Sequence, residues 1–148
     1  MKIIFLDFDG VLTTPSSDYT FTKDAIDRLG HILSETGAKL VITSSWRSET
    51  VEQMRNLLSG NQSSATRYIR FPYVKEIIGV TPHCGAWLRG QEIQKWLENT
   101  RFPVERYAII DDEEQYLQNQ KPFLVRTSHS IGITDEDVES VIRLLNHK

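Results

Sequence analysis

The chain has 148 residues, 39% of them hydrophobic and 25% charged, which suits a single globular domain with its own core. Its net charge of −3 excludes the broad basic footprint of a general nucleic-acid binder but leaves a local basic patch open. The single cysteine, Cys84, excludes an internal disulfide, and no apolar run approaches the ~20 residues of a membrane span. We therefore expect one domain over residues 1–148, located in the cytoplasm and without a membrane partner.

The predicted elements alternate between short strands and amphipathic helices. The strands are near-continuous hydrophobic runs, which is typical of strands covered on both faces in a parallel sheet. The helices carry apolar residues at intervals of three and four. In chain order we predict a strand at 2–8, a helix from 22 to 37, a strand at 38–44, a helix from 48 to 60, a loop at 59–73, a weaker strand at 74–80, a helix around 93–97, strands at 106–112 and 122–128, and a helix beginning near Thr134.

This alternation predicts right-handed βαβ units and a three-layer, doubly wound α/β fold, a Rossmann-like parallel sheet of about five strands. The last helix has a start signal of its own. Thr134 and Asp137 are spaced as a capping box in which Asp replaces the usual Glu or Gln. We find no internal repeat and no low-complexity segment.

Acidic residues stand at the ends of two predicted strands. Asp7 and Asp9 close the first, and Asp111 and Asp112 close the strand at 106–112. An isolated Asp in such a place is usually a helix N-cap or a solvated loop residue. Two pairs are different, because ligands bind beyond the carboxyl ends of the strands in this fold, and gathered carboxylates repel each other unless a cation lies among them. Mg²⁺ prefers carboxylate oxygens, so the sequence predicts a magnesium site at these four residues.

Four segments resemble the motifs of the haloacid dehalogenase (HAD) superfamily, in the order of that family. "FLDFDGVLT" resembles motif I, a strand followed by Asp-x-Asp-Gly, and "KLVITSSWR" resembles motif II, a strand that ends in Thr or Ser. "WLRGQEIQKWL" is similar to the motif III region, where Lys or Arg precedes a helix. "YAIIDDEE" resembles motif IV, a strand ending in an acidic pair. The resemblance covers essentially the whole chain and implies a HAD-like hydrolase domain.

The resemblance also implies a reaction, the Mg²⁺-dependent hydrolysis of a phosphomonoester through an aspartyl-phosphate. Asp7 matches the nucleophile, which attacks the phosphoryl group. Asp9 matches the general acid/base, and its backbone carbonyl would also bind the metal. It must arrive protonated, and a crowd of carboxylates raises the pKa of one member. From the second pair, Asp111 matches the direct metal ligand, with Asp112 acting behind it or through water.

Further positions follow from the same resemblance. Thr43 matches the motif II hydroxyl that binds the transferring phosphoryl group, and Ser44 is its rival. Gly10 would let the backbone turn closely around the phosphate. Arg89 matches the motif III cation that neutralises phosphate charge, with Arg47, Lys95 and Arg101 as weaker candidates.

Substrate choice in the family depends largely on cap insertions, and the intervals between the motifs here leave no room for a sizeable cap domain. The resemblance therefore implies an open site, which in the family often accompanies macromolecular substrates or oligomers. The layout is loosely similar to HAD phosphatase domains associated with RNA repair, with Arg67, Arg70 and Lys75 as candidate backbone contacts. The expected partner is a phosphorylated substrate, either a small molecule or a nucleic-acid end. No stable protein partner is predicted.

Four residues near these motifs are interpreted more simply. Trp87 and Trp96 are predicted to be packing residues. Trp46 is expected to contact either substrate or the core, and His129 is expected to be a loop residue that could line the pocket.

Other classes of protein fit less well. A P-loop kinase needs GxxxxGK[ST], which the sequence lacks. A receiver domain needs its acceptor Asp on a middle strand, whereas "KLVITSS" ends in hydroxyls. A HAD phosphomutase needs a cap to exclude water. A catalytically weak HAD-like module that binds phosphate and Mg²⁺, and a phosphatase for a small phosphometabolite, stay open as alternatives.

Overall fold

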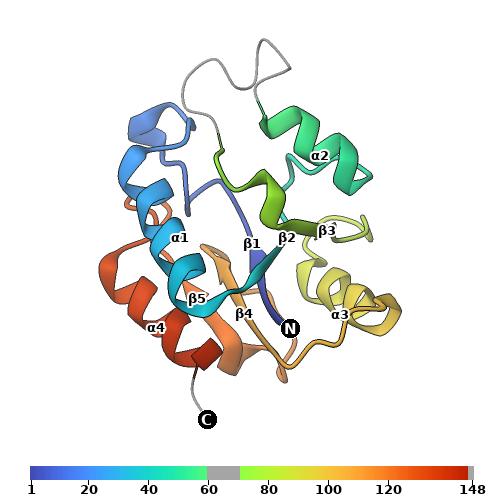
Figure 1. Cartoon of the computed structure of the whole chain (residues 1–148). Coiled ribbons are helices and arrows are strands. Elements are labelled where there is room, and N and C mark those ends of the chain that lie inside the picture. The colour runs from blue at the N-terminus through green and yellow to red at the C-terminus, as the bar shows by residue number, and fades with distance from the viewer. Residues whose placement is uncertain (60–70, 147–148) are drawn as a thin grey trace.

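The protein is built around a five-stranded parallel sheet with strand order β3-β2-β1-β4-β5 (Figure 1). The structure, a computed structural model, describes residues 1–59 and 71–146. The strand order confirms the predicted doubly wound α/β fold. The strands are β1 (Lys2–Leu6), β2 (Lys39–Ile42), β3 (Ile77–Val80), β4 (Arg106–Asp111) and β5 (Leu124–Arg126).

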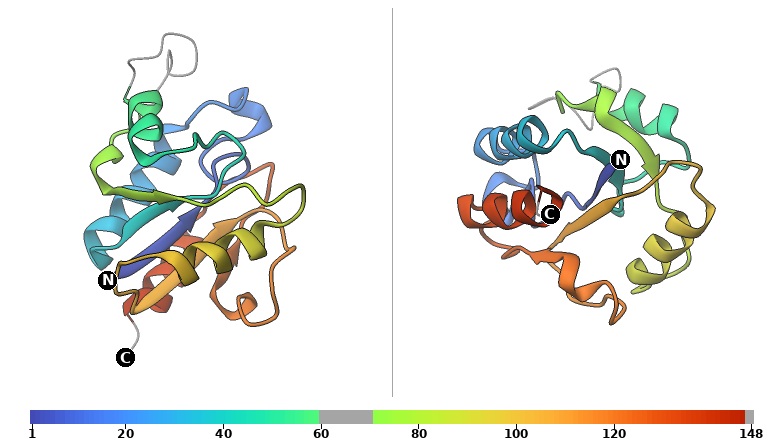
Figure 2. Two further views of the ribbon diagram at one scale, coloured as in Figure 1. Left: turned by 90° about the vertical axis from the view of Figure 1, so that its right-hand side faces the viewer. Right: turned by 60° about the horizontal axis from the view of Figure 1, so that its bottom comes forward.

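Helices cover both faces of the sheet and make the three layers visible in Figure 2. The helices are α1 (Lys23–Thr36), α2 (Val51–Leu58), α3 (Arg89–Asn99) and α4 (Asp135–Asn146). Buried side chains of α1, α2 and α4 share one hydrophobic core with alternate residues of the strands. On the other face, Ile93 of α3 is buried with Ile3, Phe5 and Val41. Successive residues of each strand therefore serve opposite cores, which explains the near-continuous hydrophobic runs.

Helix ends follow the capping signals in the sequence. The Thr22 hydroxyl accepts a hydrogen bond from the backbone N–H of Ala25 at 3.3 Å, and Gly37 ends α1 with φ +67°. Before α4, the N–H of Asp137 donates to the Thr134 hydroxyl at 3.2 Å, and the N–H of Thr134 donates to the Asp137 carboxylate at 3.0 Å. The predicted capping box is thus confirmed.

Several predicted boundaries were too wide. Helix α2 begins at Val51 rather than near Ser48, because the Thr50 hydroxyl caps it by accepting from the N–H of Gln53 at 3.1 Å. The edge strands are shorter than the runs at 74–80 and 122–128, since each run begins with a short 3-10 turn. Most of the predicted loop at 59–73, with Gly60, Arg67 and Arg70, lies outside the described residues.

The winding of the sheet changes direction between β1 and β4, which creates the crevice where ligands bind in this fold. Only a 3-10 turn and α1 stand between β1 and β2, so no cap domain is present in that interval. Among residues 1–59 and 71–146, no helix is both long and apolar enough to cross a membrane.

Candidate active site

Three of the four predicted carboxylates meet at the crevice between β1 and β4. Asp7 follows β1, and its backbone N–H donates to the carbonyl of Ile110 at 3.1 Å, which extends the pairing with β4. Asp111 ends β4 and Asp112 follows it. Oxygens of these three aspartates lie within 4.8 Å of one another, and Asp7 and Asp111 are buried. Carboxylates removed from water at this spacing need a cation among them.

Arg89, the first residue of α3, supplies one positive charge. Its Nη1 lies 2.9 Å from Asp7 Oδ1 and 2.8 Å from Asp111 Oδ2. The Tyr116 hydroxyl also donates to Asp111 Oδ2, at 2.5 Å. When all three carboxylates are ionised, the one guanidinium leaves a net negative charge, which suits a divalent cation with oxygen ligands.

Burial and repulsion shift the acidity of these groups. Burial, together with the negative charge of Asp111, raises the pKa of Asp7 to about 8, although Arg89 opposes the shift. Burial also raises the pKa of Asp111, again against the effect of Arg89. Burial alone would lower the pKa of Arg89, but Asp7 and Asp111 outweigh it and raise that pKa. Arg89 therefore offsets only part of the repulsion between the buried carboxylates, and a second cation would reduce the rest.

Asp9, the fourth predicted carboxylate, is held apart from this group. Its Oδ1 accepts from the Thr13 hydroxyl at 2.8 Å, and its Oδ2 accepts from the Trp46 indole N–H at 3.0 Å. An indole N–H can only donate, so a proton carried by Asp9 resides on Oδ1, where the Thr13 hydroxyl can turn to accept. The sequence placed Trp46 near the site but gave no sign of this hydrogen bond.

The two candidate hydroxyls after β2 differ in their surroundings. The backbone N–H of Thr43 donates to the carbonyl of Leu6 at 2.9 Å, while its buried Oγ1 has no hydrogen-bond partner among the described residues. The Ser44 hydroxyl instead accepts from the backbone N–H of Trp46 at 3.2 Å and shapes the turn. A buried polar atom without a partner is costly and commonly marks a ligand contact, so the comparison favours Thr43.

Gly10 stands where a side chain would enter the site. Its φ is +81°, and a Cβ there would lie 2.4 Å from Asp112 Oδ2 and 2.8 Å from His129 Nδ1. His129 lies against Asp112, with Nδ1 2.5 Å from Oδ2, and its Nε2 is 3.1 Å from the Tyr19 hydroxyl. Glycine is thus required both by the backbone conformation and by the close approach of this pair.

Arg47 is engaged elsewhere and does not face the carboxylates. Its Nη2 lies 2.9 Å from Glu92 Oε2, and both side chains are buried. Its Nη1 donates to the carbonyls of Thr43 and Ser44 at 3.1 and 3.0 Å. The buried pair therefore ties α3 to the turn that carries the Thr43 hydroxyl.

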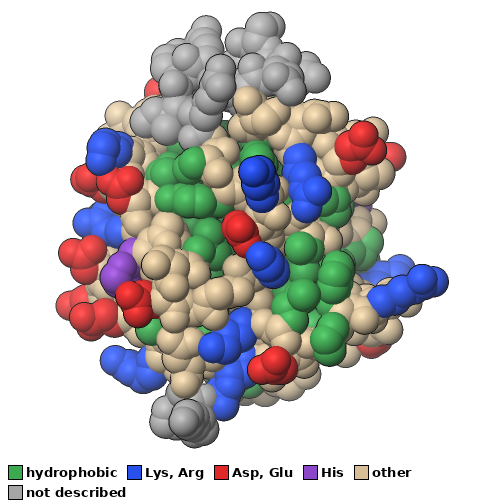
Figure 3. Space-filling model, in the orientation of Figure 1, with side chains coloured by type: hydrophobic (Ala, Val, Ile, Leu, Met, Phe, Trp, Pro, Cys, Tyr) green, Lys and Arg blue, Asp and Glu red, His purple; other side chains and the backbone are tan. Residues whose placement is uncertain are grey.

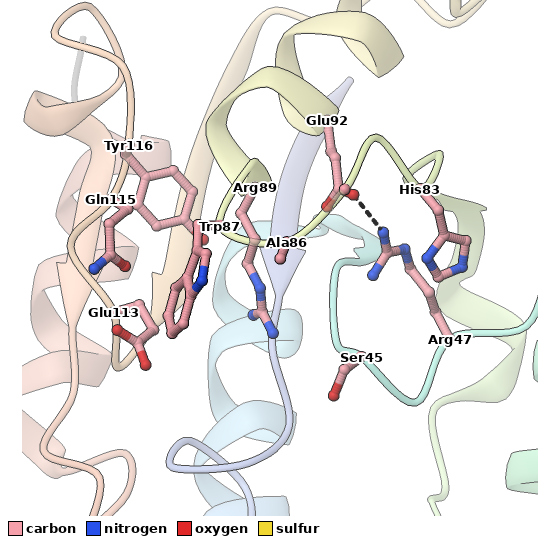
Figure 4. A pocket seen from close by; sticks show the side chains of 11 residues that line it. Ser45, Arg47, His83, Ala86, Trp87, Arg89, Glu92, Glu113, Gln115 and Tyr116 are labelled. Carbon is pink, nitrogen blue, oxygen red and sulfur yellow. Dashed lines mark ion pairs between the residues drawn. The ribbon is translucent and has the colours of Figure 1, made fainter.

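A cavity of about 380 Å³ opens beside Arg89 (Figure 4). Trp87, on the loop before α3, lines this cavity and is 72% exposed. The prediction that Trp87 is a packing residue was therefore wrong. Trp96 meets the ring of Phe5 edge-on with centroids 5.6 Å apart, which confirms its predicted packing role.

A parallel sheet in this order, with aspartates after β1 and β4, a hydroxyl after β2 and a cation at the start of α3, defines a domain of the HAD class. The family model for the HAD domain in Swiss Army Knife RNA repair proteins matches residues 3–138, and the chain belongs to this family. Searches of curated proteins and of solved structures give no significant match.

Proposed function

We propose that the protein is a Mg²⁺-dependent phosphomonoester hydrolase that acts through an aspartyl-phosphate on Asp7. The observation that carries this proposal is the convergence of Asp7, Asp111 and Asp112 within 4.8 Å, with Arg89 ion-paired to two of them. Membership of the HAD family supports the same class of chemistry.

The proposed reaction has two steps, and each residue of the site has a role in them. An Asp7 oxygen attacks phosphorus, and the bond to the leaving oxygen breaks while Asp9 gives that oxygen a proton. In the second step Asp9 takes a proton from water, the water oxygen attacks phosphorus, and Asp7 is released as a carboxylate. The Thr43 hydroxyl donates to a phosphoryl oxygen, and the Arg89 guanidinium offsets the charge of the transferring group.

The site fits a magnesium ion by the chemistry of its donors. Asp7, Asp111 and Asp112 would hold it with side-chain oxygens, and the backbone carbonyl of Asp9 is a further candidate ligand. When bound, Mg²⁺ would keep Asp7 ionised and reduce the repulsion between its carboxylate and a phosphate. Only three aspartates are grouped in the described part of the chain, so the predicted Asp9 side-chain ligand is the least supported member of the set.

The proposed substrate is a phosphorylated nucleic-acid end. The family is named for RNA repair proteins, and the open crevice would admit the end of a strand. Figure 3 views the molecule from the side where the strands begin, opposite the crevice, and shows basic and acidic side chains intermixed there rather than one continuous basic surface. Among the described residues, that face therefore offers no extended basic track for a nucleic-acid backbone.

The test is phosphate release from a panel of substrates with Mg²⁺ and with EDTA. The panel holds p-nitrophenyl phosphate, small phosphometabolites, and oligonucleotides with 3′- or 5′-phosphates. We expect metal-dependent release, with the oligonucleotides preferred over the metabolites. A folded protein that binds Mg²⁺ yet releases no phosphate from any member would contradict the proposal and favour a phosphate-binding module.

Replacing Trp46 with Phe should lower kcat/KM for a phosphorylated oligonucleotide roughly 10-fold, because its leaving oxygen needs a proton from Asp9 and Asp9 loses a hydrogen bond that sets its orientation. The Phe ring keeps most of the packing against Phe8, whose ring centroid lies 5.3 Å from that of Trp46. The matched control is Trp96→Phe, which also trims an indole that packs on a core Phe but lies on the other face of the sheet. Steady-state rates and thermal unfolding of both variants check this, and equal losses of activity would count against a positioning role.

A further inference from the structure

Trp87 is held in a conformation that packing does not explain. Its indole is 72% exposed, although Trp has one of the largest apolar surfaces of any side chain and is usually buried. Its backbone φ is +64°, a left-handed conformation that is uncommon for bulky residues and costs roughly 1–2 kcal/mol. Backbone strain that is not offset by burial of the ring indicates a functional role, and an exposed indole is available to contact a ligand.

The indole stands at the rim of the cavity next to the reacting groups. The cavity of about 380 Å³ is lined by Arg89, whose Nη1 lies 2.9 Å from the proposed nucleophile Asp7. In Figure 4 the indole stands between Arg89 and the side chains of Glu113 and Gln115, while Ser45 and His83 lie across the cavity. The cavity therefore adjoins the reacting groups through Arg89, which lines the cavity and pairs with Asp7.

We propose that this cavity binds the terminal nucleoside of the substrate, with the Trp87 indole stacked on its base. The inference rests on the proposed phosphatase function and names the substrate class of that same site. A nucleobase has a flat π-face that matches an exposed indole, and such stacking tolerates every base.

The other lining groups suit a nucleoside better than a plain aliphatic alcohol. Ser45, His83, Glu113 and Gln115 offer hydroxyl, imidazole, carboxylate and amide groups that can hydrogen-bond to base edges and sugar hydroxyls. A volume near 380 Å³ is at the small end of ligand sites, which fits one nucleoside rather than several. Recognition is thus limited to the terminal residue.

The experiment compares pairs of oligoribonucleotides that carry the same terminal phosphate on either a normal or an abasic terminal nucleotide. A second pair, a nucleoside monophosphate and ribose phosphate, separates free mononucleotides from strand ends. The proteins are the wild type, Trp87→Ala, Trp87→Phe, and Phe102→Ala as a matched control. Phe102 is also an exposed aromatic residue, 40% accessible, but it lies between α3 and β4 at the other end of the sheet.

We expect the wild type to prefer the base-bearing end roughly 5- to 150-fold in kcat/KM, the range that base–aromatic stacking provides. In Trp87→Ala the ratio of kcat/KM for base-bearing and abasic ends should fall to about one. Trp87→Phe should keep most of the preference, and Phe102→Ala should leave it unchanged. Equal rates for base-bearing and abasic ends in the wild type, or an unchanged ratio in Trp87→Ala, would overturn the inference.

Binding of the same oligonucleotides to the Asp7→Asn variant, measured by fluorescence anisotropy, provides a readout without turnover. A base-dependent affinity that is lost in Asp7→Asn/Trp87→Ala supports the nucleoside site even where hydrolysis is slow. The absence of any hydrolysis with this base preference intact would defeat the proposed phosphatase activity alone. Hydrolysis without any base preference would defeat the nucleoside site alone.

Discussion

Replacing Asp7 with Asn should abolish phosphate release and, at the same time, stabilise the protein in the absence of metal. Loss of the proposed nucleophile is expected to lower kcat by roughly 10³-fold or more. The gain in stability has a separate cause. Asp7 is buried beside Asp111, and removing its charge relieves repulsion while Arg89 keeps its contact with Asp111. We expect an increase of about 1–3 kcal/mol in the free energy of unfolding at pH 8.

The raised pKa of Asp7 determines how the free energy of unfolding changes with pH. The pKa of Asp7 rises from an ordinary 3.8 to about 8 on folding, so the folded state holds a proton that the unfolded state has released. The free energy of unfolding of the wild type therefore falls as pH rises from about 4 to about 8, and the slope ends above that range. Asp7→Asn should show a shallower slope over the same window.

Urea unfolding in EDTA at several pH values measures this prediction. Asp24→Asn changes an exposed acidic residue in the first turn of α1 that is outside the group of three aspartates, so it serves as the control and should keep the wild-type slope. Added Mg²⁺ should stabilise the wild type more than Asp7→Asn, because a ligand stabilises only the state that binds it. A variant less stable than the wild type in EDTA at pH 8 would contradict the electrostatic account of the site.

Breaking the buried pair of Arg47 and Glu92 should cost more stability than breaking any other ion pair between the described residues. Replacing Arg47 with Met leaves Glu92 as a buried carboxylate without its cation, and such changes cost ~3–5 kcal/mol. It also removes donors from the carbonyls of Thr81 and Pro82, which Arg47 holds at 2.8 and 3.1 Å. Because Arg47 also binds the carbonyl of Thr43, activity should fall with stability.

Chemical unfolding of Arg47→Met and Glu92→Gln checks this expectation. Glu92→Gln keeps the shape and an acceptor oxygen, so its loss should be smaller than that of Arg47→Met. Where Arg47→Met does not fold, Arg47→Lys is measured instead, and its loss should exceed that of Glu92→Gln since a lysine cannot reach five acceptors at once. Lys23→Met, which removes an exposed pair with Asp27, should be indistinguishable from wild type. If Arg47→Met and Lys23→Met lost similar amounts of unfolding free energy, burial would not explain the importance of the Arg47–Glu92 pair.

The fold was predictable because its local signals agree with one another. Buried parallel strands produce continuous apolar runs, and caps at Thr22, Gly37 and Thr134 fix helix ends within a few residues. The short edge strands were drawn too long, since apolar residues of a 3-10 turn look the same in sequence as those of a strand. Convergence of Asp7 with Asp111 followed from topology alone, because both stand at carboxyl ends of adjacent strands.

Contacts between distant segments were beyond the sequence. The hydrogen bond from Trp46 to Asp9 and the contact of His129 with Asp112 join residues far apart in the chain, and no periodicity or motif encodes which side chains meet. The exposure of Trp87 was missed for a related reason. An aromatic residue before a helix is usually packed, and only the backbone conformation around it shows the ring directed outward. These unpredicted contacts are those that position or extend the site.

The most direct test of the central claim is detection of a phosphoryl group on Asp7. Asp9→Asn lacks the proposed base for the second step, while p-nitrophenolate leaves without a general acid, so the intermediate should accumulate when this variant turns over p-nitrophenyl phosphate with Mg²⁺. After acid quench and proteolysis, mass spectrometry should find one phosphoryl group on the peptide that contains Asp7, and none in Asp7→Asn/Asp9→Asn. Release of p-nitrophenol with no phosphorylated peptide, or with the group on another residue, would contradict nucleophilic attack by Asp7.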